Sequence, residues 1–344
     1  MKDIFEKLDQ WRREGQQIAV TTVVETWGSA PRPIGSKMVT TMSGGIAGSV
    51  SAGCVEGAVI EVSEQVMKSQ KPNLIEYGVA DETAWQVGLA CGGKIKVFVE
   101  PGFSLDSIYP ELKKDLLDGI PFVTITFLEG PANSVNKKIL LGADGAVVGN
   151  LAVPEEVPAE LIDQAKEFLA NEKSGTVTLA DGSLVFIEAH PLPPKLFIIG
   201  AVQLSDPLIA IANTIGFDTY LIDPRTAFAT EERFPHVGKL IQEWPQEALE
   251  KYDLDKSAYI VVLTHDPKLD DPALLIALTS KASYIGALGS KRTNEKRIAR
   301  LREAGLTENQ LARLHAPIGL DLGGRSSSEI AVSIMAEIIK VRNG

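Results

Sequence analysis

The stretch KLFIIGAVQLSDPLIAIANTIGFDTYLID (195–223) decides the fold class of the C-terminal half. It opens with an apolar strand that ends at Gly200, continues as a helix, and closes with a second apolar strand that ends at Asp223. A strand, a helix and a further buried strand form a βαβ unit, which builds parallel sheets. The same rhythm continues as strand, helix and strand over 258–264, 271–280 and 282–289. We therefore predict a Rossmann-like, doubly wound parallel sheet for this half.

The N-terminal half mixes strands and helices without a βαβ rhythm, which predicts an α+β domain and an α/β protein overall. Strands are expected at 16–26, 38–41, 45–50, 73–77, 95–100, 121–127, 138–142 and, as a hairpin, 175–189. Helices are expected at 2–14, 54–69, 104–118 and 159–171. The proline-rich segment HPLPPK (190–195) is typical of a stiff linker, so we predict domains at 1–190 and 191–344. No internal repeat is evident.

Composition excludes several classes of protein. The chain has 344 residues, 44% apolar and 23% charged, as in ordinary globular proteins, and its net charge of −11 argues against a nucleic-acid binder. The N-terminus is charged and amphipathic rather than a signal peptide, and no apolar run reaches the ~18 residues of a membrane span. With only two cysteines a disulfide framework is not expected, so we expect a cytoplasmic protein that does not bind membranes.

Both cysteines lie in settings that favour a reactive thiol. Cys54 follows Ser51-Ala52-Gly53 at the predicted start of a helix, where free backbone N–H groups and the helix dipole stabilise a thiolate. Cys91 is flanked by glycines in GLACGGK (88–94). A thiolate ligates soft metals, although a lone cysteine is often just a small buried apolar residue. A zinc site is not indicated, because there is no Cys-x-x-Cys pair.

The predicted nucleotide fold departs from a complete dinucleotide fingerprint. Gly200 supplies the first glycine of Gly-x-Gly-x-x-Gly, but Val202 occupies the second position, where a pyrophosphate would approach the backbone. Asp223 stands at the strand end where an acidic residue bonds a ribose, and Arg225 could meet a phosphate instead. The alternatives are an NAD(P)-binding oxidoreductase and a scaffold that no longer binds nucleotide.

Polar groups also follow the later strands. One strand ends in Thr264-His265-Asp266, and the next runs into Gly289-Ser290-Lys291-Arg292. Ligands of such sheets lie beyond the carboxyl ends of the strands, so we expect these groups to converge on one crevice. Lys291 and Arg292 stand in the first turn of the next helix, where cations oppose the helix dipole. An anionic ligand or an acidic partner would explain them, as would a solvated helix face.

These segments together resemble the XdhC/CoxI family. In the N-terminal half the resemblance rests on GSAPRPIGSKMV (28–39), GGIAGSVSAGCVEGAVIE (44–61) and GLACGGKIKVFVEP (88–101). In the C-terminal half it rests on LIDPR (221–225), VVLTHD (261–266), YIGALGSKRT (284–293) and HAPIGLDLGGRSSSEIAVSIMAEI (315–338). Family members often carry Gly-Ala-Gly-His at the Rossmann turn, where this chain has Gly-Ala-Val-Gln, and a second histidine where it has Pro267.

The resemblance implies an accessory protein rather than a metabolic enzyme. Such proteins bind the molybdenum cofactor as cargo, support its sulfuration by a cysteine desulfurase, and help insert it into a xanthine dehydrogenase-type apo-enzyme. In the family the cysteine matching Cys54 is tied to cofactor binding, which makes it a possible ligand of the molybdenum. The cofactor-binding residues expected here are Cys54, Cys91, Gly53, Glu56, Gly92, Gly93, Gly200, Asp223, Arg225, His265, Asp266 and Ser290. A homodimer is expected, and no catalytic residue is assigned.

Two alternatives to a cofactor chaperone stay open at this point. An NAD(P)-dependent oxidoreductase would use the Rossmann half, and Val202 argues against it. A plain scaffold would bridge partner proteins without a small ligand.

Overall fold

The computed structural model describes residues 1–78, 93–131, 133–149 and 157–344. The chain divides into two compact units, Met1–Leu192 and Pro193–Gly344. We call them the N-terminal and C-terminal units and describe each by itself. Whether they are the domains expected at 1–190 and 191–344 stays a prediction.

The first part of the N-terminal unit is a helix followed by a five-stranded antiparallel sheet with a second helix on it. The strand order is β3-β2-β1-β5-β4. The elements are α1 (Lys2–Arg13), β1 (Ile18–Trp27), β2 (Lys37–Thr41), β3 (Ile46–Gly48), α2 (Glu56–Ser69), β4 (Asn73–Tyr77) and β5 (Lys94–Pro101). Ile95, Val97 and Val99 alternate along β5 and pack under α2, because successive side chains of a strand point to opposite faces.

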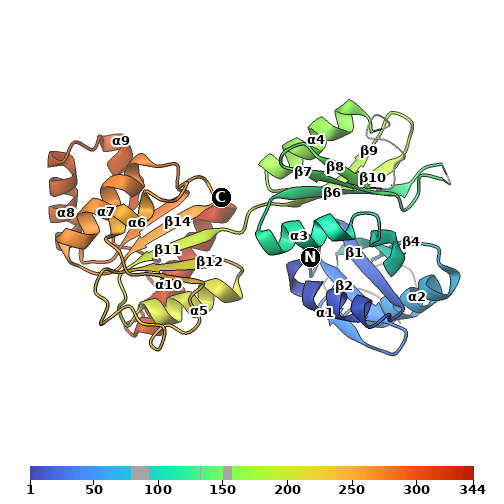
Figure 1. Cartoon of the computed structure of the whole chain (residues 1–344), viewed down its shortest axis with the longest axis horizontal. Coiled ribbons are helices and arrows are strands. Elements are labelled where there is room, and N and C mark those ends of the chain that lie inside the picture. Colours follow the sequence, from blue (N-terminus) through green and yellow to red (C-terminus); the bar gives the residue numbers. More distant parts are fainter. Residues whose placement is uncertain (79–92, 132, 150–156) are drawn as a thin grey trace. The chain divides into compact units, whose positions relative to one another are not determined.

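The second part of this unit follows a short 3-10 helix, η2 (Gly102–Leu105), and has the same plan. Its five strands are ordered β8-β7-β6-β10-β9. The elements are α3 (Tyr109–Asp118), β6 (Phe122–Glu129), β7 (Lys138–Gly142), β8 (Val147–Gly149), α4 (Ala159–Ala170), β9 (Gly175–Thr178) and β10 (Leu184–His190). Helix α4 covers one face of this sheet as α2 covers the first (Figure 1).

The N-terminal unit is therefore a structural repeat, which was not predicted from the sequence. Both halves run helix, three strands, helix, two strands, and their sheets have matching order and pairing. We call 2–101 the first repeat and 109–190 the second. The match extends to single residues: a Cβ on Gly48 would lie 2.2 Å from the Lys37 carbonyl oxygen, and one on Gly149 would lie 2.2 Å from that of Lys138. At both places only glycine lets the two strands approach.

The faces of the two sheets turned away from α2 and α4 pack against each other, and their contacts are reciprocal. Lys37 of the first repeat lies 2.8 Å from Glu188 of the second, and Lys138 of the second lies 3.0 Å from Glu100 of the first. All four side chains are buried. Beside them Val24, Phe98, Leu128 and Phe186 form one apolar cluster, with two residues from each repeat. Each repeat thus buries one glutamate whose lysine partner comes from the other repeat.

The C-terminal unit is a six-stranded parallel sheet of order β13-β12-β11-β14-β15-β16, which confirms the predicted Rossmann-like fold. Its strands are β11 (Lys195–Ile199), β12 (Asp218–Ile222), β13 (Lys239–Ile241), β14 (Ala258–Val262), β15 (Tyr284–Ala287) and β16 (Leu314–His315). Its helices are α5 (Ser205–Thr214), α6 (Pro245–Leu249), α7 (Pro267–Thr279), α8 (Lys291–Glu303), α9 (Glu308–Leu311) and α10 (Ser327–Asn343).

Helices cover both faces of this sheet, as Figure 1 shows. Leu196 and Ile198 of β11 pack toward α5 and α10, whereas Phe197 and Ile199 pack toward α6 and α7. A strand buried on both faces needs apolar residues at every position, which explains the unbroken run in the sequence. The order in which the strands are added reverses between β11 and β14, which makes the carboxyl ends of these two strands the topological switch point of the sheet.

Candidate functional site

Cys54 lies in the loop that joins β3 to α2. The sequence placed it at the first residue of the helix, but α2 begins two residues later, at Glu56. The helix starts later because Val55 (φ −122°, ψ 3°) lies outside the helical region, just after Ala52 (φ 55°) and Gly53 (φ 107°) turn the chain in left-handed conformations. Cys54 is a free, half-buried cysteine, and like Ala30 it packs against the core under α2.

The carboxylate of Glu56 holds this loop closed. One oxygen accepts from the Ser49 hydroxyl at 2.6 Å and the Ser51 amide at 2.9 Å. The other accepts from the Gly53 amide at 2.8 Å and from the Ser51 hydroxyl. Partial burial raises the pKa of Glu56, but the hydrogen bonds from Ser49 and Ser51 outweigh burial and lower the pKa to about 2. Glu56 therefore stays ionised and positions the backbone on either side of Cys54.

Small residues leave space around the thiol. A Cβ built on Gly53 would meet no atom within 4 Å, so this side of the loop is open. Gly93 approaches the neighbouring loop so closely that a Cβ there would lie 2.7 Å from the Ser29 carbonyl carbon and 2.9 Å from the Ala30 amide. Segments 28–30, 49–56 and Gly93 thus lie around the same end of the first sheet. Cys91 and Gly92 lie outside the described residues, so whether Cys91 shares the site stays a prediction.

In the C-terminal unit the structure brings most of the predicted residues to one edge of the sheet. A Cβ on Gly200 would lie 2.5 Å from Thr264 Cγ2, so the ends of β11 and β14 touch. Asp223 accepts from the Ala201 amide at 2.8 Å and from Arg225 Nε at 2.9 Å. Burial raises the pKa of Asp223, but the bonds from Arg225 and Ala201 outweigh it and hold the pKa below its ordinary value.

The remaining predicted residues of this unit end or begin helices. Asp266 caps α7 by accepting from the Lys268 amide at 3.0 Å. His265 is exposed with φ 65°, and Ser290 caps α8 through the Thr293 amide at 3.2 Å. The capping oxygens of Asp266 and Ser290 are therefore already engaged by their own helices.

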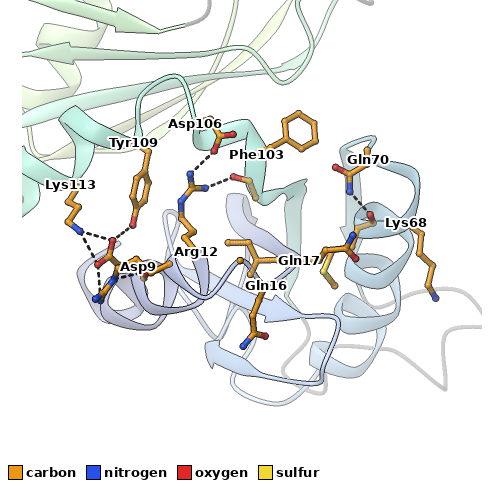
Figure 2. A pocket seen from close by; sticks show the side chains of 15 residues that line it. Asp9, Arg12, Gln16, Gln17, Lys68, Gln70, Phe103, Asp106, Tyr109 and Lys113 are labelled. Atoms are coloured by element: carbon orange, nitrogen blue, oxygen red, sulfur yellow. Dashed lines mark hydrogen bonds and ion pairs between the residues drawn. The ribbon is translucent and has the colours of Figure 1, made fainter.

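An open hollow of about 830 Å³ in the N-terminal unit was not predicted from the sequence. It lies beside the carboxyl-terminal end of α2, whereas Cys54 lies beside the other end, about 20 Å away along a helix of this length. Several of its polar groups bond to one another, as Figure 2 shows: Arg12 to Asp106, and Asp9 to Lys113 and the Tyr109 hydroxyl. This hollow and the cysteine loop are separate features.

Known families match both units. Residues 11–78 match the XdhC and CoxI family, and residues 196–338 match the XdhC Rossmann domain. This chain belongs to the XdhC/CoxI family. The first match spans the loop that holds Cys54, and the second spans every sheet strand after β11 together with most of β11 itself.

Relatives of this XdhC/CoxI chain align along nearly its whole length. A probable xanthine dehydrogenase subunit of Bacillus subtilis (strain 168) is 26% identical over 345 residues, covering 99% of this chain and 98% of that protein. The molybdenum cofactor insertion chaperone PaoD of Escherichia coli (strain K12) is 26% identical, covering 95% and 84%. A crystal structure of a xanthine dehydrogenase from Bacillus halodurans aligns with a TM-score of 0.81 at 25% identity, covering 100% and 96%.

The hypothesis of NAD(P) binding is not supported. Val202 packs against the apolar core on the α5 side of the sheet. The carboxylate that would bond a ribose, that of Asp223, is fully buried and bonded to its own chain. Within the described residues no group of three or more His, Cys, Asp or Glu side chains could hold a metal ion. A search of the same residues finds no helix long and apolar enough to span a membrane.

Proposed function

We propose that this XdhC/CoxI chain is an accessory protein that carries the molybdenum cofactor to a xanthine dehydrogenase-type apo-enzyme. The observation that carries the proposal is the loop around Cys54, where a free thiol stands in a strained turn that Glu56 holds in place. The similarity to PaoD along most of the chain supports the same function.

The chemistry of the loop suits a cargo that must later be released. A cysteine thiolate is a soft ligand, which suits a sulfur-bound molybdenum better than a carboxylate does. A single sulfur holds the metal at one point, so an acceptor enzyme can displace it. The open side at Gly53 lets a bulky group approach the sulfur without meeting a side chain. In this proposal Cys54 contacts the cargo and Glu56 is a positioning residue.

Several finer features of the proposal come from the family resemblance alone. These are sulfuration of the cargo by a cysteine desulfurase, a homodimeric state, and contributions to binding from Cys91, Gly92 and Gly93. They are proposed here together with the cargo. A cytoplasmic location, where the cofactor and the apo-enzyme would meet, is proposed with them.

The test is co-expression in a host that makes the cofactor, followed by measurement of pterin fluorescence and molybdenum in the purified chain. The wild-type chain should carry both, and Cys54→Ser should lose at least about nine-tenths of both, since loss of one metal–ligand bond removes several kcal/mol of binding. Cys54→Ser changes one atom, so its thermal unfolding midpoint should match that of the wild type. Equal cargo in the wild type and Cys54→Ser would overturn the proposal.

Glu56→Gln supplies the second arm of this test. It removes the charge that organises the loop but not the thiol, so cargo should fall by a smaller factor than in Cys54→Ser. The matched control is Glu160→Gln, which removes an exposed acid from the first turn of α4, the equivalent helix of the second repeat. Glu160→Gln should retain wild-type cargo, and equal losses in both variants would contradict a specific role for Glu56.

A further inference from the structure

A second hollow, of about 350 Å³, lies between α7 and α8 in the C-terminal unit. Its volume falls in the range of small-ligand pockets. Residues from the amino-terminal half of α7 and from one face of α8 line it: His265, Pro267, Asp270, Arg292, Thr293, Lys296, Arg297 and Arg300. The positions on α8 follow helical spacing, so they form one stripe along the helix. The lining is strongly basic in a chain whose net charge is −11.

Two of the four Arg and Lys side chains, Arg297 and Arg300, form ion pairs within the protein. Arg297 is buried and lies 2.8 Å from the equally buried Asp270, while it also donates to the Leu288 carbonyl at 3.1 Å. Arg300 grips Asp271 with two hydrogen bonds, at 2.5 and 2.9 Å. These two pairs fasten α8 to α7 and neutralise the acids of that wall. They fix the distance between the helices and therefore the width of the hollow.

The other two cations have no acid to meet. Arg292 and Lys296 are exposed, and no ion pair involves either of them within the described part of the chain. They stand one turn apart on the same face of α8, about 6 Å along the axis. Arg292 also lies in the first turn of α8, which contains no acidic residue, so its charge opposes the positive end of the helix dipole. An anion bound in the hollow would offset both charges.

We propose that the hollow between α7 and α8 binds a small anion that carries two phosphoryl groups, held by Arg292 and Lys296. A guanidinium can grip one phosphoryl group with two parallel hydrogen bonds, and an ammonium can meet the next as a point charge. Thr293 lines the hollow and is exposed beside them. Arg297 and Arg300 act as positioning residues because their charges are already paired. The site is distinct from the Gly200 turn, which does not line this hollow.

A concave site favours a small anion over an acidic protein surface. Two helices and the loop at the end of β14 line this half-open hollow, and its volume suits a small ligand that reaches Arg292 and Lys296 together. The proposal does not rest on the proposed cargo, because no residue of the cysteine loop takes part. It is tested on the whole chain purified from a host that makes no molybdenum cofactor.

The experiment is titration calorimetry with inorganic pyrophosphate, and with inorganic phosphate as a second probe. Wild type should bind pyrophosphate at one site and phosphate more weakly, since phosphate meets only one cation. Arg292→Gln/Lys296→Gln should weaken pyrophosphate binding at least about tenfold, given the strength of charge-assisted hydrogen bonds. Both side chains are exposed, so the variant should unfold at the wild-type temperature.

The matched control removes two charges near the amino-terminal ends of strands in the same sheet. Lys256 and Lys281 are exposed and precede β14 and β15, so Lys256→Gln/Lys281→Gln makes the same change in net charge away from the hollow. Its affinity for pyrophosphate should stay within about twofold of wild type, as expected for screened distant charges. Equal weakening in both double variants would mean general attraction and overturn the site. A wild type that takes up no pyrophosphate would overturn the small-anion ligand and leave an acidic protein face as its occupant.

Discussion

The two repeats of the N-terminal unit share a fold but differ in the loop before the second helix. In the first repeat the segment after Gly48 carries Cys54, and the carboxylate of Glu56 closes the loop. In the second repeat the corresponding sequence after Gly149 is NLAVPEEVP (150–158), which has no cysteine. Strand order, glycine contacts and buried ion pairs are common to both. The comparison teaches that the shared scaffold supplies stability, while the candidate function resides in one loop of one copy.

The sharpest way to break this comparison is to remove one lysine from each repeat. Lys37→Met and Lys138→Met should each lower the free energy of unfolding by about 3–5 kcal/mol, because each leaves a buried glutamate without its counter-charge. Denaturant unfolding of the whole chain measures the loss. Lys96→Met is the control, since the Lys96–Glu25 pair at 3.3 Å is partly exposed and should contribute about 1 kcal/mol or less. A large loss in only one repeat would show that the reciprocal pairs are unequal in energy.

Substitution of the two equivalent glycines, Gly48 and Gly149, should lower the free energy of unfolding by less than the lysine substitutions do. Gly149→Ala places a Cβ 2.2 Å from a backbone oxygen and should cost about 1–3 kcal/mol of stability, the usual range for overpacking. Gly48→Ala meets the same contact and also forces alanine into a left-handed conformation (φ 77°), which adds about 1–2 kcal/mol. Unfolding curves of the two variants side by side give the difference. A greater loss for Gly149→Ala would mean that the second repeat relaxes less easily than the first.

Glu56 should make the free energy of unfolding depend on pH in the acidic range. Its pKa in the folded chain is about 2, below the ordinary 4.5, so its contribution is complete above about pH 4.5 and is lost as the pH falls toward 2. Glu56→Gln should therefore lower the free energy of unfolding by about 1–2 kcal/mol at pH 7, with allowance for its partial exposure, and by progressively less below pH 4.5. Glu160→Gln in the second repeat should change stability by less than about 0.5 kcal/mol at either pH. A pH-independent loss in Glu56→Gln would show that shape rather than charge holds the loop.

The smallest expected difference concerns a pair of glutamates near the ends of β1 and β6. Glu25 contacts Lys96 and accepts from Thr176 of the second repeat at 2.6 Å, whereas Glu129 is exposed. Glu25→Gln should cost about 0.5–1 kcal/mol and Glu129→Gln less than about 0.5 kcal/mol, as partly exposed and exposed charges do. Thermal midpoints measured at low and at high salt provide the check. Salt should erase most of the difference, and a difference that salt leaves unchanged would exclude an electrostatic origin.

The sequence predicted the parallel sheet well because a strand buried on both faces has a distinctive unbroken apolar run, as in KLFII (195–199). It did not reveal the repeat, because the two copies agree at only a few scattered positions. In addition, the segment from Gly48 to β5 in the first repeat is longer than the segment from Gly149 to β10 in the second. Nothing local in the sequence says that Lys37 will meet Glu188. Such pairing depends on how two sheets pack, which periodicity does not encode.

The candidate site was predicted in part. The glycines and Cys54 stood out from their neighbours, but the helix was expected to begin two residues early, since the apolar spacing already begins at Val55, whose backbone is not helical. Glu56 was expected among the cofactor-binding residues, which stays a prediction, and the structure adds that its carboxylate is bonded to the loop around Cys54. The hollow between α7 and α8 is lined by His265 and Arg292, whose segments the sequence analysis expected to converge, and by residues further along both helices that it did not single out.

The reciprocal lysines and glutamates make the N-terminal unit indivisible. A fragment that ends at Pro101 would keep Lys37 and Glu100 but lose their partners Glu188 and Lys138, and it would expose the apolar face with Val24 and Phe98 to water. Neither half can then melt while the other stays folded, and the whole unit should unfold in a single cooperative transition. Because both sheets unfold together, the second sheet also helps to hold the strained turn at Cys54 in place, although the turn contacts only the first sheet.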